Sequence, residues 1–224
     1  MIKAKRKPLD EIFNMVKDYS RILCVGCGAC TSVCLAGGQR ETIILSQELS
    51  ECFSQTGKRS KISVFVTERQ CNVEYLVDVE DMVKEHDCII STACGVGAQF
   101  LAEKFESKPV FPALNTMFIG LDRDIALFEE RCRTCGNCKL AYTGGICPVT
   151  SCSKSLFNGP CGGTKEDGSC EVSRDVPCAW NKIYERLKAQ NRLENILSIQ
   201  PPMEWIDKGP GSFVQSGYEK RYRK

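Results

Sequence analysis

The sequence predicts an α/β protein in which a small parallel-sheet domain precedes a loop-rich, cysteine-rich domain with closing helices. Three observations support this. Residues 21–125 alternate short apolar runs with longer helical patterns, as parallel strands and crossover helices do. Eight cysteines crowd into residues 132–178, where regular strand patterns are almost absent. The 224 residues, 42% of them hydrophobic, suffice for one or two domains with a real core.

Four apolar runs predict the strands of the first domain: RILCV (21–25), KISVFV (61–66), DCIIST (87–92) and PVFPAL (109–114). The intervening segments ETIILSQELSECF (41–53) and VEYLVDVEDMVKEH (73–86) repeat apolar residues at intervals of three and four, which is typical of helices. GVGAQFLAEKF (95–105) predicts a helix that begins on glycines. Residues 1–125 should therefore form a Rossmann-like α/β layer domain.

Signals for nucleotide binding and catalysis are weak. GVGAQF follows a predicted strand, but it lacks the three-glycine fingerprint and the acidic residue expected about 20 positions later. A glycine turn beside Cys94 is the alternative interpretation. The sequence contains no nucleophile next to a base and no P-loop. His86, the only histidine, lies at a predicted helix end, where a polar cap is favoured over a catalytic base. No catalytic residue is predicted.

Cysteine usage indicates metal. The chain has 16 cysteines, and MIKAKRKPLDEIFNMVKDYS at its start contains no apolar run suited to a signal peptide. No later run reaches membrane-spanning length, so we expect a cytoplasmic protein whose thiols stay reduced and serve as metal ligands. The net charge of +2 gives no reason to expect a nucleic-acid or membrane partner, and the basic tail GYEKRYRK is interpreted as a solvated terminus.

The first group of cysteines follows the predicted strands. Cys71 follows the second strand and Cys94 the third, and the carboxyl ends of parallel strands meet at one edge of a sheet. We therefore expect a metal site there. Its candidate ligands are Cys24, Cys27, Cys30, Cys34, Cys71 and Cys94, whereas Cys52 and Cys88 stand apart.

The spacing within this group favours an iron–sulfur cluster. C-x2-C-x2-C-x3-C over residues 24–34 matches the run that wraps a [4Fe-4S] cube in bacterial ferredoxins, whereas zinc sites usually pair two short motifs at a separation. Leu35 replaces the proline expected after the fourth cysteine, and Cys71 and Cys94 compete for the fourth position. If only one cluster binds here, at least one or two of the six cysteines are not ligands. Those cysteines would instead fill the protein core as small buried apolar side chains.

The second group repeats the signal. Another C-x2-C-x2-C run is followed by the Cys147–Pro148 pair, and the segment has too few regular elements to fold without metal. Residues 126–206 are thus predicted to be a metal-binding domain, followed by a polar tail at 207–224. Eight thiols complete two four-thiolate sites. One division sets Cys132, Cys135, Cys138 and Cys178 against Cys147, Cys152, Cys161 and Cys170. Interleaved pairings are equally allowed, and one site could hold zinc instead of iron.

A helix should follow Cys178. Trp180, Ile183, Tyr184 and Leu187 recur on one helical face before a proline stop. The simpler interpretation is a helix packed over the metal region. The alternative is a surface that docks a partner.

The ordered motifs of this chain resemble a known family. The resemblance covers residues from about 20 to 206 and is carried by CVGCGACTSVCLAGG, ERQC, ACGVG, PVFPALNTMFIG, CRTCGNCKLAYTGGICPVTSC, KSLFNGPCGG and PCAWNKIYERL. The chain is similar to the iron–sulfur subunits of bacterial methylenetetrahydrofolate reductase, the methylenetetrahydrofolate reductase C-terminal family. The resemblance implies a separate flavin-containing TIM-barrel catalytic subunit that reduces methylenetetrahydrofolate to methyltetrahydrofolate, typically in anaerobes that use the acetyl-CoA pathway.

In that role the chain is a non-catalytic redox subunit that relays electrons to the partner's flavin. We expect about two [4Fe-4S] clusters and at most three, with one zinc ion as an alternative occupant. The donor would be a low-potential carrier such as ferredoxin or a further redox subunit. Two other functions are open: a structural metal module that braces the catalytic subunit, and an electron carrier for another one-carbon or corrinoid enzyme.

Overall fold

The chain folds as two units in the computed structural model, Met1–Arg133 and Thr134–Lys224. The structure describes residues 1–203, 211 and 214–222. The first unit contains two sheets with their helices, and the second consists largely of loops with short helices.

A parallel sheet forms the centre of the first unit, as the sequence predicted. Its strands are β2 (Arg21–Cys27), β3 (Lys61–Thr67), β4 (Cys88–Ser91) and β5 (Val110–Pro112), in the order β3-β2-β4-β5. All three strand pairs are parallel. The chain runs from β2 outward to β3 and then returns to the other side of β2 to form β4. The direction of winding therefore changes between β2 and β4, the position at which parallel sheets place their ligand crevice.

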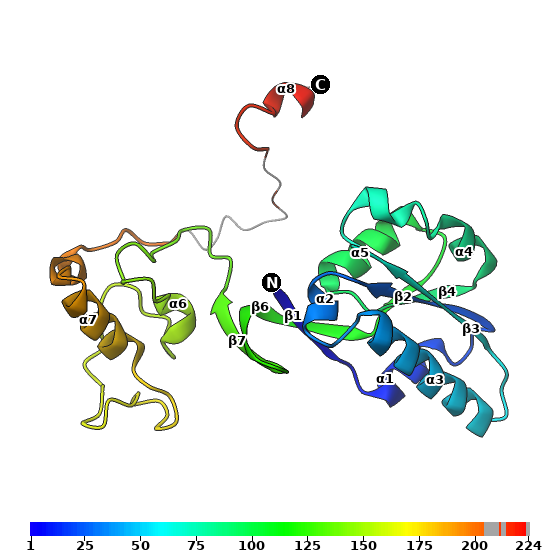
Figure 1. Cartoon of the computed structure of the whole chain (residues 1–224), viewed down its shortest axis with the longest axis horizontal. Helices are drawn as coiled ribbons and strands as arrows, with labels where there is room; N and C mark the ends of the chain where they lie inside the picture. Colours follow the sequence, from blue (N-terminus) through cyan, green and yellow to red (C-terminus); the bar gives the residue numbers. More distant parts are fainter. Residues whose placement is uncertain (204–210, 212–213, 223–224) are drawn as a thin grey trace. The chain divides into compact units, whose positions relative to one another are not determined.

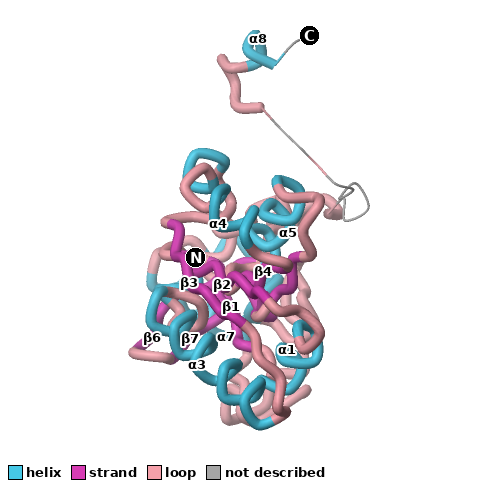
Figure 2. The backbone as a smooth tube through the Cα atoms, turned by 90° about the vertical axis from the view of Figure 1, so that its right-hand side faces the viewer, coloured by secondary structure: helices cyan, strands magenta, loops and turns pink. Residues whose placement is uncertain are grey.

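Helices cover both faces of this sheet (Figure 1). On one face lie α1 (Leu9–Val16) and α3 (Gln39–Gln55), and on the other lie α4 (Glu80–Glu85) and α5 (Gly95–Lys104). Figure 2 shows the strands between α3 on one side and α4 and α5 on the other. Side chains of β2 alternate between the two faces: Ile22 packs toward α1 and α3, and Leu23 packs toward α4 and α5. Each face thus has its own hydrophobic core.

Two short helices join these elements. The 3-10 helix η1 (Val73–Leu76) and α4 together replace the single helix predicted over 73–86. Helix α2 (Cys30–Val33) follows β2 directly.

His86 ends α4, where its Nδ1 lies 2.6 Å from the Met82 carbonyl and its Nε2 lies 2.8 Å from the Ser63 hydroxyl.

A second sheet, antiparallel, was not predicted. Its strands are β1 (Ile2–Arg6), β6 (Leu114–Asp124) and β7 (Leu127–Cys132), in the order β1-β6-β7. The segment predicted as one strand over 109–114 divides here, because β5 ends at Pro112 and β6 begins at Leu114. Lys3 on β1 is buried, forms an ion pair with Asp122 and lies 4.6 Å from the centre of the Phe128 ring. A buried lysine with these partners can occupy a strand that otherwise looks too polar.

The described part of the second unit has four short helices: α6 (Pro148–Ser151), α7 (Ala179–Ala189), η2 (Leu193–Leu197) and α8 (Glu219–Tyr222). Helix α7 is the helix that the sequence predicted after Cys178. Its buried face includes Trp180, Ile183 and Leu187, whereas Tyr184 is 42% exposed. The Trp180 indole N–H donates to the Leu156 carbonyl at 2.9 Å, so this helix is fixed to the loop that follows α6.

The predicted polar tail at 207–224 lies partly outside the described residues. Its described part includes α8, which carries Lys220 and Arg221 in its last turn. Across residues 1–203, 211 and 214–222, no helix has the length and apolar character needed to cross a membrane.

Candidate metal centres

Three of the predicted ligands meet at the carboxyl edge of the parallel sheet. Cys27 is the last residue of β2, Cys71 follows β3, and Cys94 lies between β4 and the first residue of α5. Partial burial raises the pKa of the Cys71 thiol, and the charges of Cys27 and Cys94 raise that pKa further. This mutual influence means that the three sulfurs are close enough for their charges to interact. A cation at this edge would relieve the repulsion between three thiolates.

The loop after β2 is held against the same edge. Cys30 begins α2, and the chain then returns so that the Cys27 N–H donates to the Gly37 carbonyl at 3.0 Å. A Cβ atom at Gly37 would lie 1.7 Å from the Thr92 carbonyl oxygen. Only glycine therefore allows this close approach of the loop to the end of β4. The approach fixes the far end of the loop that carries Cys30, at Gly37, against the ends of β2 and β4.

Two of the six predicted ligands lie in hydrophobic clusters instead. Cys24 is fully buried in the core beneath α1 and α3, and burial raises its pKa to about 12. Cys34 is buried with Ala4 and Leu114, and its Sγ lies 3.8 Å from the Ala4 carbonyl oxygen. The structure brings Cys27, Cys71 and Cys94 together, and it does not bring Cys24 to them.

The two cysteines that the sequence set apart have ordinary surroundings. Cys88 begins β4, is fully buried in the same core as Cys24, and has its pKa raised by burial to about 12. Cys52 lies half-buried on α3.

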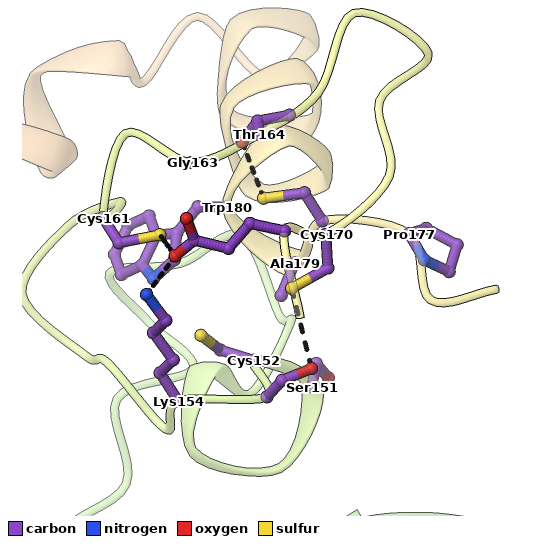
Figure 3. Close-up of a pocket in the computed structure, with 13 residues that line it drawn as sticks. Ser151, Cys152, Lys154, Cys161, Gly163, Thr164, Cys170, Pro177, Ala179 and Trp180 are labelled. Atoms are coloured by element: carbon purple, nitrogen blue, oxygen red, sulfur yellow. Dashed lines mark hydrogen bonds and ion pairs between the residues drawn. The ribbon is translucent and has the colours of Figure 1, made fainter. Parts of the chain in front are cut away.

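Four thiols of the second unit line one pocket (Figure 3). Cys152 follows α6, Cys178 immediately precedes α7, and Cys161 and Cys170 come from the loops between these helices. The loop that bears Cys170 and Cys178 folds back on itself, because the Cys178 N–H donates to the Gly168 carbonyl at 2.9 Å and the Cys170 N–H donates to the Val176 carbonyl at 2.8 Å. These backbone bonds bring the segments of Cys170 and Cys178 together.

Hydroxyl groups lie within hydrogen-bonding distance of two of these sulfurs. The Thr164 hydroxyl donates to the Cys178 sulfur at 3.0 Å. The Val172 backbone N–H and the Ser153 hydroxyl, whose oxygen lies 3.7 Å from the Cys170 sulfur, lower the pKa of Cys170. Thiolates are the form of cysteine that binds metal. The surroundings of Cys170 therefore favour the form that binds metal.

A charged pair that the sequence reasoning missed also lines this pocket. Lys154 forms an ion pair with Glu171, and the Cys161 thiol donates to a Glu171 carboxylate oxygen at 3.3 Å (Figure 3). The only sequence signal is position, since Lys154 lies two residues after Cys152 and Glu171 directly follows Cys170. With Glu171 in this position the enclosed volume is about 20 Å³, which is room for about one water-sized body.

The remaining predicted ligands lie elsewhere. Cys132 ends β7 in the first unit, while Cys135, Cys138 and Cys147 belong to the second unit and do not line the pocket described above. Cys135 and Cys147 are half-buried, and Cys132 and Cys138 are exposed. Among the described residues, no three His, Cys, Asp or Glu side chains form a group that could hold a metal ion.

Comparison with known proteins gave one match. Residues 111–206 match a family model described as "Methylene-tetrahydrofolate reductase C terminal". This segment begins within β5 and includes β6, β7 and the thiol-lined pocket of the second unit. The chain matches neither the curated proteins nor the solved structures with which it was compared.

Proposed function

Because residues 111–206 belong to the methylene-tetrahydrofolate reductase C-terminal family, we propose that the chain is a MetV-like iron–sulfur subunit of a methylenetetrahydrofolate reductase. It passes electrons to the flavin of a separate catalytic subunit, which reduces methylenetetrahydrofolate to methyltetrahydrofolate. The observation that carries this proposal is the meeting of Cys27, Cys71 and Cys94 at the carboxyl edge of the parallel sheet. The electron donor is a low-potential carrier such as ferredoxin, in a reducing cytoplasm.

The ligand set in the first unit is Cys27, Cys30, Cys71 and Cys94. Cys27 and Cys30 supply the C-x2-C pair of ferredoxin-type runs, and the other two thiols come from the ends of neighbouring strands. Each iron of a cube takes its own thiolate, so the ligands of a cube are spread more widely than those of a single ion. Bound there, a [4Fe-4S] cluster would supply one-electron transfer.

The fold supports this location. The sheet order β3-β2-β4-β5 has its reversal between β2 and β4, and Cys27 and Cys94 follow those two strands. This is the ligand position of Rossmann-like and related doubly wound sheets. The first unit would thus hold thiolates at the edge where doubly wound sheets place their ligands.

A partner is necessary because the reaction needs a hydride equivalent, whereas a cluster passes electrons singly. The flavin that stands between them belongs to the catalytic subunit. The chain's own residues hold the redox centre, exclude water from it and present it to the partner. Cys27 and Cys94 are buried, 6% and 9% exposed, so the protein would exclude water from their side of the cluster. Cys71 is exposed, so its side of the cluster would be open to a partner.

A second candidate function rests on the pocket in the second unit. Cys152, Cys161, Cys170 and Cys178 line one pocket with room for about one water-sized body, and four thiolates are a ligand set of structural zinc sites. A closed four-thiolate zinc site is usually structural. It would brace a unit whose described residues have few regular elements. The run that contains Cys132, Cys135 and Cys138 is still a sequence prediction of cluster ligands.

Metal analysis of the full chain, purified without oxygen, tests the proposal. Iron, acid-labile sulfide and zinc are counted per chain, with about four irons expected for each cluster and about two clusters in total. Zinc in place of one cluster would favour the structural function for the second unit. Fewer than about three irons per chain, with intact protein, would contradict the electron-transfer function.

A further inference from the structure

The Gln70 side chain is fully buried at the carboxyl edge of the parallel sheet, and both ends of its amide are used. Its Nε2 donates to the Val25 carbonyl at 2.8 Å and to the Gly26 carbonyl at 3.2 Å. Its Oε1 accepts from the Ser91 hydroxyl at 2.7 Å. One side chain thus joins the ends of β2 and β4, although it belongs to the segment that follows β3.

These bonds reach the backbone next to each of the three thiols at this edge. Gly26 precedes Cys27, and Gln70 itself precedes Cys71. The Ala93 N–H donates to the Ser91 Oγ at 3.3 Å, and Ala93 precedes Cys94. The amide and its hydroxyl partner therefore contact three separate chain segments, each directly before one of these cysteines.

Packing around Gln70 is tight on the side of α5. A Cβ atom at Gly97 would lie 2.9 Å from the Gln70 Cβ and 2.8 Å from the Ala93 Cβ. Glycine at position 97 lets the first turn of α5 lie directly on Gln70. The start of that helix, and with it Cys94, is held at a fixed distance from the Cys71 segment.

The sheet does not depend on this amide for its own hydrogen bonding. The Thr92 N–H donates to the Val25 carbonyl at 3.0 Å, which continues the pairing of β2 with β4 without Gln70. On the opposite face, the hydroxyls of Thr42 and Thr92 lie 2.8 Å apart and add another link. A buried amide is costly unless all its partners are present. Its placement here is best explained by the residues that follow the strands.

We infer that Gln70 is the positioning residue for the thiol site of the first unit, an inference that rests on the proposed cluster-holding function of Cys27, Cys71 and Cys94. It contacts no sulfur in the described bonds and acts through the backbone on either side of each thiol. Residues that orient ligands in this way typically change metal affinity by about 10- to 100-fold when they are replaced. Sequence reasoning missed Gln70, because a glutamine before a cysteine carries no spacing signal.

The test compares three variants of the full chain, prepared without oxygen. Gln70→Leu removes all the amide bonds at similar volume, and Ser91→Ala removes only the hydroxyl link. Ser63→Ala is the matched control, because it removes a hydroxyl bonded to His86 within the same sheet but away from the thiols. The first-unit cluster is identified as the electron paramagnetic resonance signal that Cys71→Ser abolishes. Its line shape and the rate of iron release to a chelator are then measured.

Gln70→Leu should release this iron about tenfold faster or more and should alter the line shape. Ser91→Ala should have a smaller effect in the same direction. Ser63→Ala should behave as wild type. Folded Gln70→Leu with wild-type release and line shape would overturn the inference. If Gln70→Leu fails to fold, Ser91→Ala decides by the same two readouts. Wild-type protein without iron contradicts the proposed function itself, whereas iron-loaded wild type with indifferent variants contradicts the role of Gln70 alone.

Discussion

Cys24 and Cys27 both lie on β2, yet their side chains face opposite sides of the parallel sheet. Cys24 packs in the core formed with α1 and α3. Cys27 shares the parity of Leu23 and Val25, which face α4 and α5, and it stands at the strand end beside Cys71. Two members of one C-x2-C pair therefore have different roles: the first fills a core and the second is available as a ligand.

Replacement of each cysteine separates the two roles. Cys24→Ala should leave iron and sulfide content unchanged and lower the free energy of unfolding by about 1 kcal/mol. Cys27→Ser should lose about four irons per chain and keep most of its stability. Metal analysis and denaturant unfolding check both variants. Equal iron loss in the two would contradict the assignment of Cys24 to the core.

The buried pair Cys24 and Cys88 predicts a pH dependence of stability. Burial raises the pKa of each from 9.0 to about 12 in the folded protein, so both stay protonated while the unfolded chain ionises near 9. Their contribution is complete below about pH 9 and is lost as the pH rises toward 12, at about 1.4 kcal/mol per pH unit for each thiol. Denaturant unfolding of the reduced chain at several alkaline pH values measures this slope. A Cys88→Val variant that keeps the full slope would contradict the explanation.

How far the sequence could predict the fold depends on how each strand is buried. Strands β2 and β4 were predictable, because nearly every residue in them is buried and apolar. Strand β1 was not, since it reads IKAKR and pairs with β6 more than a hundred residues away, as Ile2 does with Ile119. Its buried Lys3 is explained only by Asp122 and Phe128, which no local pattern indicates.

The sequence indicated which cysteines are candidate ligands, from their spacing and from their positions after predicted strands. It could not show that Cys24 faces a core and Cys27 an edge, because that depends on strand parity. In the second unit Cys178 lines a pocket with Cys152, Cys161 and Cys170. One division of the eight cysteines made from the sequence had instead grouped Cys178 with Cys132, Cys135 and Cys138. The difference arises from the folding back of the loop between Gly168 and Cys178, a backbone feature without a sequence spacing of its own.

Metal should hold the second unit together. Cys161→Ser and Cys178→Ser each replace one thiol that lines the pocket. Each variant should lose one metal centre, because a four-thiolate site rarely survives the loss of a ligand. Limited proteolysis of the full chain should then cut within residues 134–203 faster than in wild type. Cys52→Ser, on the surface of α3, is the control and should change neither property. Wild-type metal content and protease resistance in both pocket variants would contradict a metal-dependent fold.

Leu187 and Tyr184 on helix α7 differ in burial, and we expect different effects from their replacement. Leu187 is fully buried, so Leu187→Ala should cost about 2 to 5 kcal/mol of stability. Tyr184 is 42% exposed, and Tyr184→Ala should leave the unfolding midpoint unchanged while weakening binding to the flavin-containing subunit. Calorimetric titration of each variant with that subunit measures the effect. Wild-type affinity for Tyr184→Ala would leave α7 as a packing helix only.

The most direct measurement of the central claim is reduction of the catalytic subunit's flavin by a one-electron donor. Purified flavin-containing subunit and reduced methyl viologen are mixed with methylenetetrahydrofolate in three tubes that contain no second chain, the wild-type chain, or its Cys27→Ser variant. Rapid turnover is expected only in the tube with the wild-type chain. Equal rates in all three tubes would contradict an electron-transfer role and leave the structural one.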